Sequence, residues 1–119
     1  MAGEVAFVEL GVEDAERGRA FYEGLFGWRM QPGPSGSGWT WSVGDGVGGG
    51  MHAGDRAAQP YVFFRVDDLD AALARVRELG GTVDEMDVEG DEDKQARFGR
   101  FKLCTDDQGS HFGLHQPPR

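Results

Sequence analysis

The sequence contains a single cysteine, Cys104, so a disulfide within the chain is excluded. No apolar run comes near the ~20 residues that a membrane-spanning helix requires. Residues 1–10 contain two glutamates and lack the basic segment, followed by an apolar segment, that marks a secretory signal. From these absences we expect a cytoplasmic protein that has no membrane partner.

Positive charge is also scarce, with 12 lysines and arginines against 21 aspartates and glutamates and a formal net charge of −9. A nucleic-acid-binding protein needs clustered basic residues to replace the counterions of the phosphates, and the basic residues here are scattered. An anionic membrane surface is disfavoured for the same reason. We therefore expect no nucleic-acid partner.

An internal repeat organises the 119 residues. An offset of 54 residues aligns residues 12–14 with residues 66–68, which are Val-Glu-Asp and Val-Asp-Asp. Gly50-Met51-His52 is also similar to Gly113-Leu114-His115. The length suits one domain. The sequence thus predicts a single domain, 1–119, made of two modules, about 1–56 and about 57–119.

Each module is predicted to run from a strand into a helix and then into further strands. Asp14 is a suitable N-cap for a helix that begins near Ala15 and ends at Gly27. In the second module Asp67 or Asp68 serves as the N-cap, and the two glycines at 80–81 end the helix. The predicted strands are 5–10, 28–31, 39–43, about 48–53, 61–66, 82–88, 100–105 and 111–116, with an acidic loop at 89–94.

Side chains alternate along a strand, so each strand has two faces. In the first strand, Ala6, Val8 and Leu10 oppose Val5, Phe7 and Glu9; in the fifth, Val62, Phe64 and Val66 oppose Tyr61, Phe63 and Arg65. In the last hairpin we expect Phe101, Leu103, Phe112 and Leu114 to oppose Arg100, Lys102, Cys104, His111, Gly113 and His115. The apolar faces should pack under the helices. The mixed faces form either a ligand cleft or a solvated face, and the pattern alone leaves both open.

Three segments resemble the vicinal oxygen chelate superfamily, which includes glyoxalases and bleomycin-resistance proteins. Residues 12–14 with the run Phe-Tyr-Glu-Gly-Leu-Phe-Gly-Trp at 21–28 resemble its first-helix signature. Residues 66–72 and 79–81 resemble its second helix, and 105–114 resemble its closing hairpin, with Asp107 where proline is usual. The resemblance covers nearly the whole chain. It implies an α+β fold of two tandem βαβββ modules, with curved mixed sheets around a cleft, and a homodimer.

Metal-dependent members of this superfamily hold a divalent ion with histidine and glutamate side chains from four strands. The resemblance carries these positions over to Phe7, roughly Gly50, Tyr61 and Gly113. Phenylalanine and glycine offer no donor atom, and a neutral tyrosine is a poor ligand. We therefore expect no metal cofactor. Such an aromatic-walled pocket resembles the drug-sequestering members of the superfamily and suits a flat organic molecule.

The residues predicted to bind this ligand are Phe7, Glu9, Trp39, Trp41, Tyr61, Phe63, Lys102 and His111. The alternatives are ordinary: aromatic side chains in short strands also form cores or dimer interfaces, and Trp39 and Trp41 can cover a sheet edge. Arg65, Arg100 and Lys102 either anchor an anionic group or are surface charges. The preferred function is metal-free binding of a small, aromatic molecule for sequestration, drug resistance or biosynthesis.

Two other classes of function stay open. His52, His111 and His115 are expected on the mixed faces, so His111 or His115 can act as the base of a lyase or isomerase. A shifted metal site would instead combine the histidines with Glu9. Cys104, if it lies opposite His111, is either a nucleophile or an inert buried residue. The third class is an interaction module without a ligand.

Overall fold

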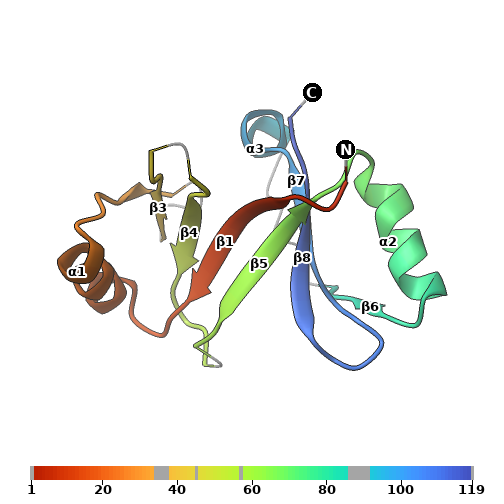
Figure 1. Ribbon diagram of the computed structural model, residues 1–119, viewed down its shortest axis with the longest axis horizontal. Coiled ribbons are helices and arrows are strands. Elements are labelled where there is room, and N and C mark those ends of the chain that lie inside the picture. Colours follow the sequence, from red (N-terminus) through yellow and green to blue (C-terminus); the bar gives the residue numbers. More distant parts are fainter. Residues whose placement is uncertain (1, 34–37, 45, 57, 86–91, 119) are drawn as a thin grey trace. The chain divides into compact units, whose positions relative to one another are not determined.

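The computed structural model describes residues 2–33, 38–44, 46–56, 58–85 and 92–118. Its internal contacts divide the chain into two compact units: a first unit, Phe7–Tyr61, and a second unit, Met1–Ala6 together with Val62–Arg119. Each unit combines helix with sheet, so the predicted α+β class is confirmed (Figure 1). Within the described residues, no helix is long and apolar enough to cross a membrane.

The first unit holds the greater part of β1 (Val5–Gly11), followed by α1 (Ala15–Phe26), β2 (Gln31–Pro32), β3 (Trp39–Trp41) and β4 (Gly49–His52). Its strand order is β2-β3-β4-β1, with β4 antiparallel to β3 and parallel to β1. The predicted limits of α1 are confirmed. Asp14 accepts a hydrogen bond from the Arg17 N–H, and Gly27 ends the helix at a φ of 72°. The strand predicted at 28–31 differs from the observed one, because β2 contains only Gln31–Pro32.

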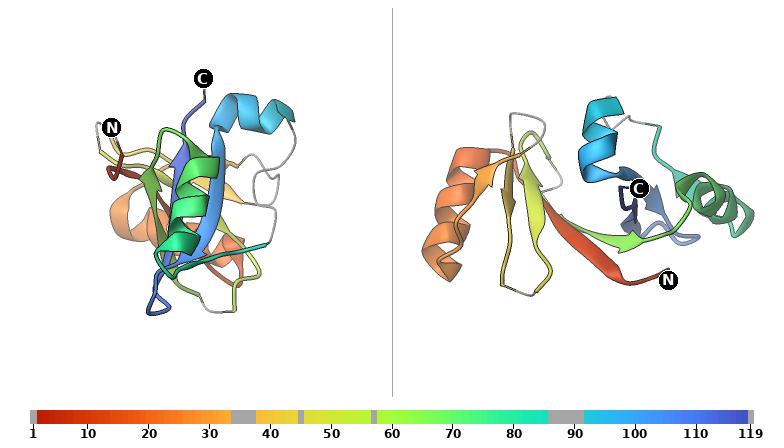
Figure 2. Two further views of the ribbon diagram at one scale, coloured as in Figure 1. Left: turned by 90° about the vertical axis from the view of Figure 1, so that its right-hand side faces the viewer. Right: turned by 90° about the horizontal axis from the view of Figure 1, so that it is seen from above.

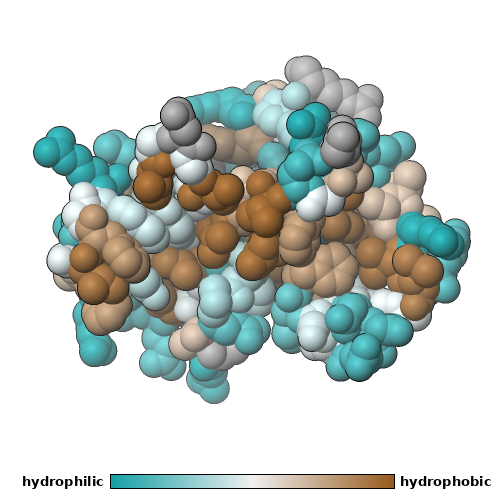
Figure 3. Space-filling model, in the orientation of Figure 1, coloured by the Kyte–Doolittle hydropathy of each residue, from teal (hydrophilic) through white to brown (hydrophobic). Residues whose placement is uncertain are grey.

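α1 lies along one side of the strands of the first unit (Figures 1 and 2). The core between them contains the buried Met30, Trp41 and Met51, and Trp28 stacks on Trp41 with ring centroids 4.6 Å apart. No residue of α1 is itself fully buried. Apolar side chains instead gather on the surface over α1 (Figure 3), where the helix exposes Phe21, Leu25 and Phe26.

The second unit holds most of β5 (Pro60–Arg65), then α2 (Leu69–Glu78), β6 (Thr82–Val83), α3 (Glu92–Phe98), β7 (Arg100–Thr105) and β8 (His111–Gln116). Its strand order is β5-β8-β7-β6, with β5 and β8 parallel and the other pairs antiparallel. Of the two predicted N-caps of α2 the structure selects Asp68, which accepts from the Ala71 N–H at 3.1 Å. α2 packs on β7 and β8 (Figure 2) and buries Leu69 and Leu73 with Leu114.

The predicted register of the β7–β8 hairpin was wrong by one residue. Cys104 pairs with Phe112, and His111 pairs with Thr105. The reason lies in the turn, where the Asp106 carboxylate accepts from the Ser110 N–H at 3.0 Å and the Asp106 N–H donates to the Ser110 carbonyl at 2.9 Å. These bonds include Ser110 in the turn and shift every pair that follows.

Because of this shift, the side chains of β7 that were predicted to face α2 lie on the opposite side of the sheet, and the others face α2. Arg100, Lys102 and Cys104 lie on the face under α2, and Phe101 and Leu103 lie on the opposite face. The segment before β7 also differs from the prediction. Part of the expected acidic loop 89–94 is the start of α3, and of the strand expected at 82–88 only Thr82–Val83 is strand, with 86–91 outside the described residues.

Candidate functional site

In the first unit, the sheet face opposite α1 carries Glu9 and His52. β1 and β4 run in parallel register, with Glu9 beside Gly50 and Gly11 beside His52. The alternating residues Leu10 and Met51 point into the core under α1. We call the opposite face, with Glu9, Gly50 and His52, the network face. The sequence prediction that Glu9 and His52 share one face is confirmed.

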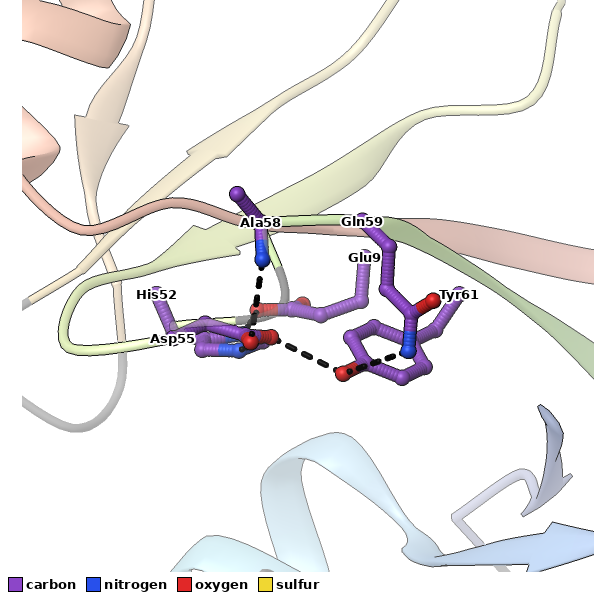
Figure 4. Close-up of polar contacts among 6 residues, drawn as sticks. All are labelled: Glu9, His52, Asp55, Ala58, Gln59 and Tyr61. Carbon is purple, nitrogen blue, oxygen red and sulfur yellow. Dashed lines mark hydrogen bonds and ion pairs between the residues drawn. The ribbon is translucent and has the colours of Figure 1, made fainter.

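Five side chains form a continuous chain of hydrogen bonds on this face, shown in Figure 4. His52 Nδ1 lies 2.7 Å from Glu9 Oε2, and His52 Nε2 lies 3.1 Å from Asp55 Oδ2. The Tyr61 hydroxyl donates to Asp55 Oδ2 at 2.9 Å, and Gln59 Nε2 donates to that hydroxyl at 3.2 Å. We call Glu9, His52, Asp55, Gln59 and Tyr61 the His52 network. Its members come from β1, β4, the turn that follows β4, and β5.

Two glycines allow this close packing. A Cβ atom at Gly11 would collide with the Asp55 carboxylate, and a Cβ atom at Gly50 would lie 2.5 Å from Glu9 Oε1. The turn holds Asp55 from the other side, because its Oδ1 accepts from the Ala58 N–H at 3.2 Å. The carboxylates of Asp55 and Glu9 therefore rest directly on backbone that carries no side chain.

The surroundings of His52 favour its protonated, positively charged form. The hydrogen bond to the Glu9 carboxylate raises the pKa of His52 above its ordinary value of 6.5, and the charges of Glu9 and Asp55 raise it further. Partial burial acts in the opposite direction but is outweighed. A protonated imidazole donates from both nitrogens, which matches a carboxylate oxygen beside each of them. When His52 is protonated, the site is thus an imidazolium held between two carboxylates.

The residues present do not fit the metal ion of the superfamily. Phe7, Gly50 and Gly113, at three of the positions implied by the resemblance, have no donor atom, and the Tyr61 hydroxyl is engaged with Asp55. The shifted site is no better, because both nitrogens of His52 face carboxylates and no lone pair of the ring is directed at a cation. Over the described ranges, no group of three or more histidine, cysteine or acidic residues has the geometry to hold a metal ion.

The second unit has a related but different face, opposite α2. Phe63 lies beside Gly113, and a Cβ atom at Gly113 would collide with the Phe63 ring. Phe63 also meets Phe101 edge to face, with centroids 6.0 Å apart. His115 Nε2 donates to the Phe98 carbonyl at 2.8 Å, which fixes β8 to the end of α3. His111 lies at the exposed start of β8.

Several predicted ligand-binding residues lie elsewhere. Trp41 is buried under α1, and Trp39, on the same face of β3, lies under the Arg19 guanidinium at 4.4 Å. They are therefore on the helix side of the first unit, away from Glu9. Lys102 lies on the α2 side of β7, so its predicted grouping with His111 was wrong.

Arg100 and Cys104 also have structural roles. Arg100 forms a two-pronged ion pair with Asp70 of α2, both bonds 3.1 Å long, and this pair lowers the pKa of Asp70. Cys104 is buried in the core under α2, and its burial raises the pKa of its thiol to about 11. Such a thiol is almost fully protonated at neutral pH, which removes the nucleophile hypothesis.

The first unit has two hollows, and only the second is lined by a member of the His52 network, Gln59. One, of about 510 Å³, is lined mainly by residues 27–29 and 40–42; the other, also about 510 Å³, lies between α1 and the segment 58–60. Sequence reasoning missed Asp55 and Gln59. The spacing His52-Ala-Gly-Asp55, in a glycine-containing turn, was a usable signal, because such a turn can return a carboxylate to the histidine.

The comparisons with known proteins agree with this architecture. A family model described as "Glyoxalase-like domain" matches residues 7–115. The chain is 30% identical to "Anthracycline biosynthesis protein DnrV" of Streptomyces peucetius over 134 aligned positions, covering 94% of this chain and 46% of that protein. The chain thus spans about half the length of this relative.

Solved structures share the fold at low identity. Methylmalonyl-CoA epimerase from Mycobacterium tuberculosis superposes with a TM-score of 0.65 at 18% identity, covering 98% of this chain and 89% of that one. Homoprotocatechuate 2,3-dioxygenase from Brevibacterium fuscum gives 0.72 at 20% identity, covering 98% of this chain and 37% of the other. The resemblance predicted from the helix and hairpin motifs is confirmed.

Proposed function

Since the chain belongs to the glyoxalase-like family of the vicinal oxygen chelate superfamily, we propose that it binds a small, aromatic organic molecule on the network face without a metal ion. The observation that carries this proposal is the His52 network, a fixed set of charged and polar groups beside the Tyr61 ring. Ligand sites typically combine aromatic surface with a few oriented polar groups.

Two further observations support an aromatic ligand. The side chains that take the place of metal ligands in the first unit, Phe7 and Tyr61, are aromatic, and the partly exposed Phe7 offers ring surface for stacking. The relative DnrV is named for anthracycline biosynthesis, and an anthracycline is a polycyclic aromatic compound. A role in sequestration, in resistance or beside a biosynthetic pathway fits both observations.

The family also supports a homodimer as the working form of the chain. α1 exposes Phe21, Leu25 and Phe26 at 63%, 59% and 56%, an apolar surface that a second copy would cover. Native mass spectrometry of the purified protein tests this proposal, since a dimer is expected and a monomer at all concentrations would contradict it. Phe21→Glu should weaken the dimer, whereas Glu85→Gln, on an exposed segment of the second unit, should not.

Binding itself is tested by titrating the protein with planar aromatic compounds, namely naphthols, hydroxylated anthraquinones and an anthracyclinone, in a fluorescence assay. The expected result is saturable binding of at least one compound, recovered unchanged after extraction. Asp55→Ala, which removes the centre of the His52 network, should abolish this binding, and Glu85→Gln should leave it intact. Absence of saturable binding by the whole panel would overturn the proposed function.

The second candidate is an enzyme that moves a proton without a metal, as a lyase or isomerase does. The His52 network favours it, because an imidazolium beside a carboxylate can donate and accept protons. Of the three histidines, this argument selects His52, since His115 is bonded to a backbone carbonyl and His111 lies at an exposed strand end. Conversion of a bound compound, lost in His52→Gln while binding is retained, would favour the enzyme over the binding protein.

A further inference from the structure

The two oxygens of the Glu9 carboxylate have different surroundings. Oε2 is engaged with His52 Nδ1 at 2.7 Å. Oε1 lies against Gly50, which carries no side chain, and among the residues that the structure describes it accepts no hydrogen bond. The side chain is 23% exposed. Because a carboxylate oxygen is a strong acceptor and never a donor, Oε1 is available for a donor group from outside the protein.

The other members of the His52 network are already engaged. Both nitrogens of His52 face carboxylates, and Asp55 holds His52, Tyr61 and the Ala58 N–H at once. The Tyr61 hydroxyl donates to Asp55 and accepts from Gln59. Glu9, at the end of this chain of bonds, is therefore the member with acceptor capacity to spare.

The charge of the network has a definite sign. Glu9 and Asp55 each carry one negative charge and His52 one positive charge, so the group carries one net negative charge when all three are ionised. No lysine or arginine of the described ranges forms an ion pair with Glu9. A second anion beside Glu9 would be repelled in this partly desolvated position.

We propose that Glu9 determines ligand specificity: Oε1 accepts a hydrogen bond from a hydroxyl group of an uncharged hydroxylated aromatic ligand, a phenol in the simplest case, and the network disfavours carboxylate and phosphate ligands. This inference rests on the proposed function and names the substrate class of the same site. Gly50 is part of the specificity, because the absence of a Cβ atom there leaves the space in which Oε1 lies. The repeat-related position in the second unit, Gly113, lies under the Phe63 ring and offers no acceptor.

Three probes of one ring skeleton test the inference: 2-naphthol, 2-methoxynaphthalene and 2-naphthoate. 2-Naphthol supplies a donor, the methoxy compound has similar size and no donor, and the naphthoate is an anion. With the unmodified protein, 2-naphthol should bind roughly tenfold more tightly than 2-methoxynaphthalene, as expected for one hydrogen bond to a charged acceptor. 2-Naphthoate should bind most weakly of the three.

Two variants examine the two parts of the proposal separately. Glu9→Gln keeps the shape and removes the charge, so the preference for 2-naphthol should shrink and 2-naphthoate should gain affinity. Gly50→Ala places a methyl group against Oε1, where the contact is with the movable end of the Glu9 side chain, and should weaken 2-naphthol binding with little effect on folding. Glu85→Gln is the matched control, an identical change at an exposed glutamate of the second unit, and circular dichroism verifies that each variant is folded.

The outcomes separate this inference from the proposed function. Equal affinity for 2-naphthol and 2-methoxynaphthalene, or tightest binding of 2-naphthoate, overturns the role of Glu9 and leaves an aromatic binding site in place. A preference for 2-naphthol that survives both Glu9→Gln and Gly50→Ala also overturns it. Failure of the naphthalene probes, together with the wider aromatic panel, removes the proposed function and this inference with it.

Discussion

The two units contain repeat-related positions that do different work. His52 and His115 correspond in the repeat, as do Gly50 and Gly113. In the first unit the glycine lies under a carboxylate, Glu9, and the histidine is held by two carboxylates. In the second unit the glycine lies under the Phe63 ring, and the histidine donates to a backbone carbonyl.

Related glycine and histidine positions thus hold a hydrogen-bonded network in the first unit and packing contacts in the second. The helices show the same division: α2 buries Leu69 and Leu73, whereas α1 has no fully buried residue. The comparison indicates that one unit can stabilise the fold by apolar packing while the other keeps polar groups that cost folding energy.

The largest effect is expected from the cores under the two helices. Leu69→Ala, at a residue that is 0% exposed, should lower the free energy of unfolding by about 2–5 kcal/mol. Leu25→Ala, at a residue that is 59% exposed on α1, should change it by less than about 0.5 kcal/mol at concentrations where the chain is monomeric. Urea denaturation followed by circular dichroism measures both, and equal losses would contradict the division between the helices.

The next effect concerns the buried polar contact of the second unit. Gln116 is 8% exposed, and its side-chain carbonyl accepts from the Leu69 N–H at 2.9 Å, at the start of α2. Gln116→Leu leaves this N–H without its partner and should cost about 1–3 kcal/mol, with ligand binding unchanged. The repeat-related Ala53 is exposed, so Ala53→Gln is the control and should cost little. Loss of ligand binding in a folded Gln116→Leu variant would show that the second unit also takes part in ligand binding.

A smaller effect distinguishes His52 by its dependence on pH. Its pKa is raised in the folded state, so its stabilising contribution is complete below pH 6.5 and is lost as the pH rises through the higher folded pKa. His52→Gln should therefore destabilise the protein more in acid than in alkali, by about 1 kcal/mol or less because the side chain is 41% exposed.

Proton NMR of the His52 ring measures the same pKa directly. The midpoint should lie above 6.5 in the unmodified protein and move down in Glu9→Gln, since the hydrogen bond to Glu9 is its largest cause. A midpoint at or below 6.5 would contradict the charged network.

The prediction with the smallest effect on stability concerns the reactivity of the Cys104 thiol in the core under α2. A rise in the pKa of Cys104 from 9.0 to about 11 reduces the thiolate fraction roughly a hundredfold at neutral pH. An aromatic disulfide reagent should therefore react with the folded protein more slowly than with the unfolded chain by at least that factor. Comparable rates would show that the core under α2 opens readily.

Much of the fold follows from local signals in the sequence. Asp14 and Gly27 bound α1 as predicted, because an N-cap carboxylate and a left-handed glycine act within a few residues. Asp68 begins α2 for the same reason. The alternation along β1 placed Glu9 opposite the core, and the vicinal oxygen chelate resemblance rested on motifs of the same local kind.

Tertiary contacts decided the remainder. The β7–β8 register depends on whether Ser110 joins the turn, which its bonds with Asp106 settle and the residue types leave open. Trp39 and Trp41 followed the alternation of β3, yet only the position of α1 determined which face is the core. The sequence by itself determined the α+β class and the placing of Glu9 and His52 on one face. That Tyr61 and Gln59 complete the network was decided by the tertiary structure, because hydrogen bonds between separate segments require distances that no spacing along the chain specifies.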